Sequence, residues 1–106
     1  MTRVAAGLLS GFEENKPYAF HHDGLDLVLV RCENDVFALE DVCSHAEVAL
    51  SEGDVRGCHI ECWMHGSAFD VRTGVPDSPP AVKPVRTFPV SINEQDGTPT
   101  VFVEIG

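Results

Sequence analysis

Three cysteines and three histidines fall within the 23 residues from position 43 to 65, "CSHAEVALSEGDVRGCHIECWMH". Thiolate sulfur and imidazole nitrogen are the side-chain ligands that suit zinc and iron. Four of these residues form two spaced pairs, a C-x-H box at Cys43 and His45 and a C-x-x-H box at Cys62 and His65. Each box follows an expected strand, so two loops at one end of a β-structure can bring the four side chains around a common point. The segment therefore predicts a metal centre.

The order of the ligands bears on which metal is bound. Tetrahedral zinc sites usually pair like ligands, C-x(2–4)-C with H-x(3–5)-H, whereas each box here supplies one cysteine and one histidine. This pattern favours two metals, with both thiolates on one iron and both imidazoles on the other, as in the Rieske [2Fe-2S] arrangement. A zinc-stabilised interaction module with two cysteine and two histidine ligands remains the alternative.

The other cysteines and the intervening histidine have a simpler interpretation. On an expected strand "GCHIEC", Cys58 and Ile60 face the core while His59 faces solvent, because side chains alternate along a strand. We predict that Cys58 and His59 are structural or incidental, and we treat Cys32, at the end of an apolar strand, in the same way. A disulfide between Cys32 and Cys58 is geometrically possible, but it is not expected in a reducing compartment.

Period-two alternation of apolar and polar residues dominates the chain and predicts an all-β, antiparallel fold. No segment of ordinary length has the helical period, and turn signals separate the runs. The clearest pair is a hairpin formed by "GLDLVLVRC" and "NDVFALE". Further short strands are expected at "RVAAG", "YAFHH", "GCHIEC", "AFDV", "FPVSI" and "TVFVEI".

Length and charge limit the possible classes of partner. A chain of 106 residues with 43% hydrophobic residues fits one globular domain over residues 1–106. Seven basic against seventeen acidic residues give a net charge of −10, which disfavours nucleic acid and anionic membranes. Since no apolar run reaches the roughly 18 residues of a membrane span, we expect a cytoplasmic protein, monomeric and without membrane contact.

With these residues in view, the run "CSHAEVALSEGDVRGCHIECWMHGSAFDVRTGVPDSPPAVKPV" resembles the cluster-binding part of the Rieske family, and "LVLVRCENDVFALEDVC" resembles the strands that precede it. The resemblance covers roughly residues 25–92. It implies an antiparallel Rieske-type β-sandwich whose two loops form a cluster-binding subdomain at about residues 41–85. It also implies one [2Fe-2S] cluster, with the inner iron on Cys43 and Cys62 and the outer iron on His45 and His65.

Residues around the second box are expected to support the cluster. Gly66 lets the backbone approach closely, and its loop would offer N–H groups to the cluster sulfides. Ser67 occupies the position where relatives have a hydroxyl that donates to the cluster. We interpret Met64, and less directly Trp63, as apolar cover that excludes water, with docking of a partner as the alternative for Trp63.

The resemblance also separates classes within the family. Quinol-oxidising relatives carry an extra cysteine in each box and join them in a disulfide, but the equivalent residues here are Val48 and Met64. Their tyrosine donor is replaced by Phe69. Because each lost donor leaves the reduced cluster less stabilised, we predict a reduction potential in the lower part of the range of about −150 to +300 mV.

These features resemble the ferredoxin components of multicomponent aromatic-ring dioxygenases, such as those acting on biphenyl, naphthalene-like compounds or carbazole. The implied partners are an NAD(P)H-dependent reductase and a terminal Rieske non-haem iron oxygenase, and the chain itself would catalyse no reaction. The alternative is a Rieske-like small subunit or ferredoxin of another redox system, such as nitrite reduction or iron-sulfur assembly.

Two further features could contribute to function. Acidic residues near the boxes could form a docking rim for a basic partner, or they could be ordinary solubilising charges. The proline-rich segment at residues 71–85 should be a stiff loop, either a simple surface connection or a lid over the site. The acidic residues concerned, which outnumber Arg56, are Glu47, Glu52, Asp54 and Glu61.

Overall fold

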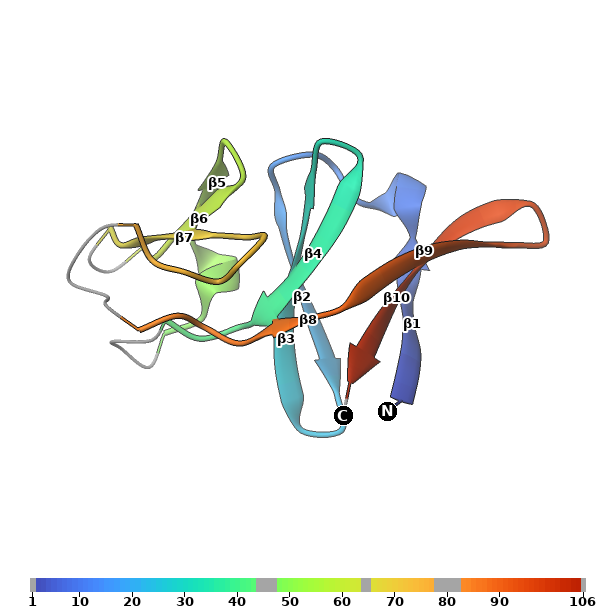
Figure 1. Ribbon diagram of the computed structural model, residues 1–106, viewed down its shortest axis with the longest axis horizontal. Helices are drawn as coiled ribbons and strands as arrows, with labels where there is room; N and C mark the ends of the chain where they lie inside the picture. Colours follow the sequence, from blue (N-terminus) through green and yellow to red (C-terminus); the bar gives the residue numbers. More distant parts are fainter. Residues whose placement is uncertain (1, 44–47, 64–65, 78–82, 106) are drawn as a thin grey trace.

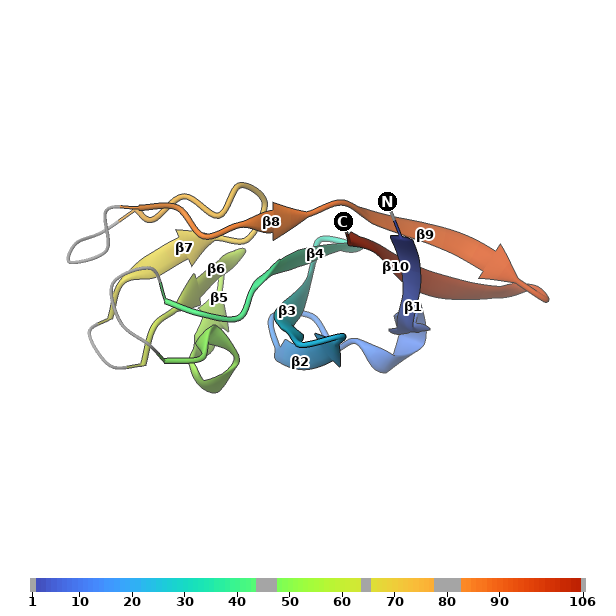
Figure 2. The ribbon, with the colours of Figure 1, turned by 90° about the horizontal axis from the view of Figure 1, so that it is seen from below.

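The computed structural model describes residues 2–43, 48–63, 66–77 and 83–105. In this part of the chain, three antiparallel sheets follow one another along the longest axis, within overall extents of 45 × 27 × 19 Å (Figures 1 and 2). The strands are β1 (Thr2–Leu8), β2 (Pro17–His22), β3 (Leu25–Cys32), β4 (Asp35–Glu40), β5 (Asp54–Arg56), β6 (His59–Glu61), β7 (Ala68–Asp70), β8 (Thr87–Phe88), β9 (Val90–Gln95) and β10 (Thr98–Ile105).

Two of the sheets form a base. Strands β2, β3, β4 and β8 make one sheet in that order, and strands β1, β10 and β9 make the other. Apolar side chains from both sheets meet in a buried core, which stabilises the base by removing this surface from water. Its buried members are Phe12, Leu27, Leu29, Val36, Ala38, Phe88, Val101 and Val103.

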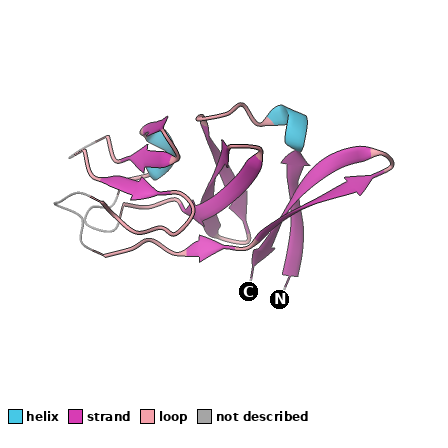
Figure 3. Ribbon diagram, turned by 45° about the horizontal axis from the view of Figure 1, so that its top comes forward, coloured by secondary structure: helices cyan, strands magenta, loops and turns pink. Residues whose placement is uncertain are grey.

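The third sheet, β5-β6-β7, lies beside the base (Figure 1). In the chain, the first box lies between β4 and β5, and the second lies between β6 and β7. The third sheet has its own buried core, which includes Leu50, Ile60 and Phe69. Of the described segments only two are helical, the single 3-10 turns η1 (Leu9–Gly11) and η2 (Leu50–Glu52) (Figure 3).

The hairpin β3–β4 is a wall shared by the two cores. Leu27 and Leu29 on one face of β3 belong to the core of the base, whereas Val28 and Val30 on the other face belong to the core of the third sheet. A strand buried on both faces must be apolar at every position, which explains the run "LVLV" in β3. The position of the third sheet is therefore set by packing against the back of this hairpin.

The expected all-β antiparallel fold is confirmed, and most of the expected strands are present within two residues. The strand expected over "FPVSI" is instead divided at Pro89, with Phe88 in β8 of one base sheet and Val90 in β9 of the other. Two further local differences concern the third sheet. Strand β5 was not foreseen, because its three residues are too few for a pattern to stand out. Gly57 and Cys58 form the turn between β5 and β6, so the strand expected over "GCHIEC" begins only at His59. Within the described part of the chain, no helix is long and apolar enough to cross a membrane.

Candidate metal centre

Each ligand box begins a loop that is closed by the same kind of backbone hydrogen bond. The N–H of Cys43 donates to the carbonyl oxygen of Val48 over 2.9 Å, and the N–H of Cys62 donates to that of Ser67 over 2.8 Å. In both cases donor and acceptor are five positions apart in the sequence (48 − 43 and 67 − 62). The two loops are therefore closed across the same number of residues, and the cysteine is the first residue of each loop.

The two cysteines lie in the interior, at the loop bases. Cys43 is 2% exposed and Cys62 is fully buried, and both belong to the core of the third sheet. A thiolate buried in apolar surroundings is unfavourable unless a positive charge compensates it, and a metal ion does so directly. Two buried thiols held in one core by matching loops fit the inner, sulfur-ligated metal of a two-metal centre.

The predicted histidine ligands lie outside the residues that the structure describes. His45 and His65 fall in the two undescribed segments of the loops, and so does Met64. Among the described residues, no three histidine, cysteine or acidic side chains gather as a metal site. The sequence spacing, and not the geometry, therefore carries the prediction that these two imidazoles complete the ligand set.

The residues after the second box have distinct environments. Gly66 has φ +75°, a left-handed conformation that favours glycine, and its N–H donates to the carbonyl oxygen of Cys62 over 2.9 Å. This N–H thus closes the loop, and the expected N–H donors to the cluster sulfides stay a prediction. Ser67 is fully buried. Trp63 is 53% exposed, which favours its alternative role in docking over apolar cover.

Strand pairing fixes the direction in which the second box leaves the sheet. Strand β6 is paired on both sides, with Ile60 opposite Val55 of β5 and opposite Phe69 of β7. Phe69, at the position of the tyrosine donor in quinol-oxidising relatives, is fully buried. Cys62 follows β6 directly, so its place depends on this central strand.

The chain approaches this strand closely at Gly53, a residue that the sequence reasoning missed. Gly53 has φ −93°, which any residue can adopt, but a Cβ built on it would collide with the carbonyl oxygen of Glu61. Glycine is needed here for space alone. The only signal in the sequence is the glycine itself, which indicates a turn and does not reveal a close approach to another strand.

The proline-rich segment after β7 folds back along that strand. Pro76 forms an antiparallel bridge with Phe69, and the N–H of Asp77 donates to the carbonyl oxygen of Ala68 over 2.9 Å. Residues 78–82 of the segment lie outside the described part of the chain. Attachment to β7 is therefore observed, while a lid over the site stays a prediction.

An arginine and a carboxylate pair at the end of β7. Arg72 donates from its Nε and Nη2 to the two carboxylate oxygens of Asp70, each over 3.0 Å, and its backbone N–H donates over 2.8 Å. The side-chain hydrogen bond from Arg72 lowers the pKa of Asp70, against the effect of partial burial, which raises it. This pair fixes the turn after β7. In the same turn, the N–H of Gly74 donates to the backbone carbonyl oxygen of Asp70.

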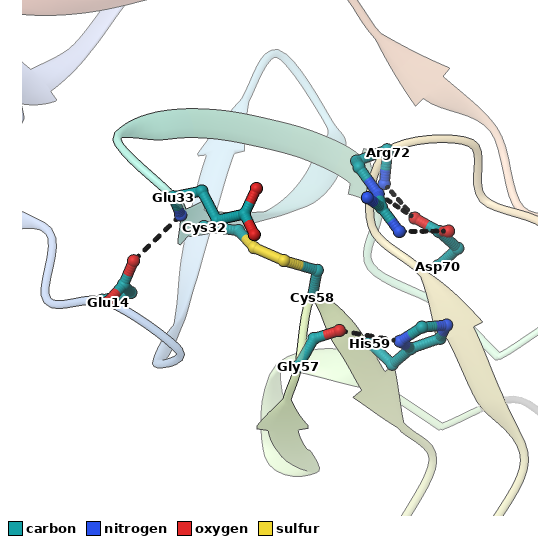
Figure 4. Close-up of a disulfide and its surroundings, with 8 residues drawn as sticks. All are labelled: Glu14, Cys32, Glu33, Gly57, Cys58, His59, Asp70 and Arg72. Atoms are coloured by element: carbon teal, nitrogen blue, oxygen red, sulfur yellow. Dashed lines mark hydrogen bonds and ion pairs between the residues drawn. A yellow bond between two sulfur atoms is a disulfide. The ribbon is translucent and has the colours of Figure 1, made fainter.

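The residues between the boxes differ in part from the expectation. Cys58 is buried with Ile60 as predicted, but it forms a disulfide with Cys32, which we did not expect (Figure 4). His59 is not simply solvated: Nδ1 lies 2.9 Å from the carbonyl oxygen of Gly57, and Nε2 lies 3.0 Å from a carboxylate oxygen of Asp77. His59 therefore joins β6 to the segment after β7 and serves a structural role.

Three of the four acidic residues named for the docking rim are described and have exposed side chains: Glu52, Asp54 and Glu61. Asp54 and Glu61 are opposite each other in the register of β5 and β6. Like charges at paired positions repel, and an approaching cation relieves this repulsion. The arrangement is compatible with steering of a basic partner.

A family match, related sequences and similar solved structures all connect this chain to Rieske [2Fe-2S] proteins. The family described as "Rieske [2Fe-2S] domain" matches residues 2–89. The anthranilate 1,2-dioxygenase ferredoxin subunit of Burkholderia cepacia is 36% identical over 86 residues, which are 81% of this chain and 80% of that protein. The ferredoxin of carbazole 1,9a-dioxygenase from Nocardioides aromaticivorans IC177 superposes with a TM-score of 0.87 at 38% identity, over 97% of each chain.

A third similar structure is a complex of reduced oxygenase and oxidised ferredoxin in carbazole 1,9a-dioxygenase. The matched chain of that complex has a TM-score of 0.83 and 31% identity, over 95% of this chain and 91% of the other. The family match, together with the two buried thiols on matching loops, supports a Rieske-type [2Fe-2S] cluster over the zinc alternative. This chain belongs to the Rieske [2Fe-2S] domain family.

Proposed function

We propose that this chain is a one-electron carrier, the ferredoxin component of an aromatic-ring dioxygenase system. The observation that carries the proposal is the pair of equally closed loops with buried Cys43 and Cys62, in a fold that matches a dioxygenase ferredoxin over 97% of both chains. A ferredoxin component passes electrons and has no catalytic site of its own. The named relatives support this class over a nitrite-reductase or iron-sulfur assembly subunit.

The four box residues are the proposed cluster ligands. Cys43 and Cys62 would hold the inner iron, and His45 and His65 the outer iron. The bound cluster supplies a one-electron couple. The buried loop bases keep water from the thiolates, while the core around Phe69 holds the two loops in fixed relation to each other.

The proposed partners are an NAD(P)H-dependent reductase that supplies electrons and a terminal Rieske non-haem iron oxygenase that accepts them. The similar structure in which a reduced oxygenase is in complex with an oxidised ferredoxin supports the second partner. We place the protein in the cytoplasm as a monomer, since short-lived docking with two partners in turn suits a small carrier.

Trp63 is the proposed anchor of the docking surface. An indole that is half exposed next to a ligand cysteine offers apolar area to a partner, and tryptophan is prominent among residues that dominate binding energy. Exposed Glu52, Asp54 and Glu61 would steer a basic partner toward it, and this steering should weaken as salt screens the charges.

The ligand assignment is tested by spectroscopy on purified protein. We expect iron and acid-labile sulfide in equal amounts, together with an electron paramagnetic resonance signal of low average g-value in the reduced sample. His45→Ala or His65→Ala should abolish this signal. His59→Ala is the matched control, because His59 contacts Gly57 and Asp77 through both ring nitrogens, and it should keep the signal.

The carrier role needs a second experiment. Oxidation of NAD(P)H by a reductase, coupled to oxygen use by an oxygenase, should depend on adding this protein and should slow as salt increases. A colourless protein containing zinc without iron would refute the cluster. A loaded protein that never restores electron flow between reductase and oxygenase of any dioxygenase system would refute the carrier role.

A further inference from the structure

A disulfide links the wall of the base to the sheet that carries the ligand boxes. Cys32 is the last residue of β3, and Cys58 lies in the turn between β5 and β6 (Figure 4). Their Cα atoms are 5.6 Å apart, within the usual span of a disulfide, and 26 positions separate them in the sequence. The two cysteines are therefore placed to be bridged without movement of the backbone.

The turn that holds Cys58 is shaped for this contact. Arg56 pairs with His59, so Gly57 and Cys58 form a two-residue hairpin turn, and both have positive φ (+52° and +65°). Turns of this kind favour glycine, asparagine or aspartate at both positions. A cysteine is unfavourable there on backbone grounds, and the side chain gains a compensating interaction by reaching Cys32.

Contacts of Cys58 connect the bridge to the site. Three residues of β6 separate Cys58 from Cys62, the predicted ligand. The carbonyl oxygen of Cys58 also accepts the N–H of Val71 over 3.0 Å, which joins the end of β7 to the same turn. On the other side, Cys32 is part of the wall whose register is fixed by its pairing with Asp35.

We propose that the Cys32–Cys58 disulfide is a covalent staple that holds the cluster-bearing sheet against the β3–β4 wall and slows loss of the cluster. The role in cluster retention rests on the proposed function. The crosslink itself does not, because it involves neither of the predicted cysteine ligands.

The bond forms by exchange with a small-molecule disulfide as oxidant. One cysteine thiolate attacks the oxidant, which releases one thiol and leaves a mixed disulfide on the chain. The second cysteine thiolate attacks the chain sulfur and expels the second thiol. The two cysteines thus lose two protons and two electrons in total, and the oxidant becomes two thiols.

Once formed, the staple is shielded from reductants. Cys32 is 3% and Cys58 is 7% exposed, whereas exchange requires a thiolate to reach one of the sulfurs. Two acidic residues are held near the bridge: Glu33 follows Cys32 directly in the chain, and its N–H donates to the Glu14 carboxylate over 2.9 Å (Figure 4). Their negative charge repels an incoming thiolate.

The crosslink is tested first by alkylation and mass spectrometry. Holoprotein is unfolded in iodoacetamide without reductant, and a second sample is treated with dithiothreitol before alkylation. The chain has four cysteines, so the staple predicts two modified cysteines in the first sample and four in the second. Four modified cysteines without reductant would overturn the proposal. This readout needs no cluster, so it stands even if the proposed function fails.

The role of the staple is tested by the rate of cluster loss. Bleaching of the visible absorbance in an iron chelator is followed for the wild type and for the double variant Cys32→Ala/Cys58→Ala, each with and without dithiothreitol. We expect bleaching about tenfold faster in the variant, since removing a bridge of this kind favours opening by at least that factor. Dithiothreitol added in mild denaturant, which exposes the shielded bridge, should accelerate bleaching of the wild type only. Equal rates in all four samples would overturn the role.

If the double variant does not fold, the wild type alone decides. Bleaching is then compared before and after reduction in mild denaturant, with alkylation confirming that Cys32 and Cys58 have opened. Faster bleaching after opening supports the staple, and an unchanged rate refutes it.

Discussion

Replacement of Gly53 by alanine should damage both the fold and the metal centre, because this residue approaches β6 without room for a side chain. The added Cβ would overlap the carbonyl oxygen of Glu61, the residue before Cys62, and would lie 3.3 Å from the carbonyl oxygen of Leu50. Backbone strain plays no part, since the φ of Gly53 is −93° and suits alanine. The expected loss of stability therefore comes only from displacing β6.

The size of the effect follows from how firmly Glu61 is held. Glu61 pairs with Asp54 of β5 and with Ala68 of β7, so its carbonyl oxygen cannot move without disturbing two strand pairings. Inserting a methyl group into a filled space costs about 1–3 kcal/mol, and a backbone obstacle on a central strand places Gly53→Ala at about 2–3 kcal/mol. For a domain of this size, that corresponds to a fall in Tm of about 8–15 °C.

Gly11→Ala is the matched control, because a Cβ at Gly11 meets nothing within 4 Å. Thermal unfolding followed by circular dichroism gives Tm, and bleaching of the visible absorbance gives cluster retention. We expect Gly11→Ala to remain within about 0.5 kcal/mol of the wild type. If Gly53→Ala unfolded at the same temperature as Gly11→Ala and kept its cluster equally long, the close approach of Gly53 to β6 would not matter, and the reasoning would be refuted.

Three further predictions concern single side chains. Arg72→Gln removes the partner that lowers the pKa of Asp70, a stabilisation present above pH 3.8 and lost as the pH falls through the folded-state value. Stability near neutral pH should fall slightly, because solvent screens this exposed pair, with the difference from the wild type vanishing in acid titrations. Ser67→Ala should lower the reduction potential by about 45–90 mV, measured by potentiometry, if its buried hydroxyl donates to the cluster. Trp63→Ala should raise the KM for this protein in a reconstituted system by about tenfold at unchanged Tm, and an unchanged KM would exclude a docking role.

Most strands of the base could be predicted from the sequence because they are six to eight residues long and rich in apolar and β-branched residues. Half-buried and exposed side chains alternate from Tyr18 to His22 of β2, and the turns between strands carry glycine, asparagine or aspartate. The short strand β5 could not be predicted, since its three residues pair with β6 only through tertiary contacts. The division of β3 between two cores was also missed, although its uninterrupted run from Leu27 to Val30 carried the signal.

The candidate site was predicted from the spacing of the ligands within each loop, which can be read directly from the sequence. Burial of Cys43 and Cys62 in one core could not be derived from spacing, since it depends on how β5, β6 and β7 pack against the wall. The role of Gly53 was beyond reach for the same reason. A close approach between segments eight positions apart leaves no mark in the sequence except the glycine itself.

The disulfide was misjudged because a rule about compartments was applied without regard to access. A reducing compartment acts on a disulfide only through exchange, and exchange requires contact between a thiolate and a bridged sulfur. Cys32 and Cys58 are nearly inaccessible in the folded protein, and Glu33, the next residue after Cys32, adds a negative charge to this segment. Reduction must therefore wait for the cluster-bearing sheet to separate from the wall, and this is the motion that the bridge opposes. Whether Cys32, at the end of β3, and Cys58, in the β5–β6 turn, form a disulfide thus depends on how these two hairpins pack. The redox state of the compartment is a weaker guide.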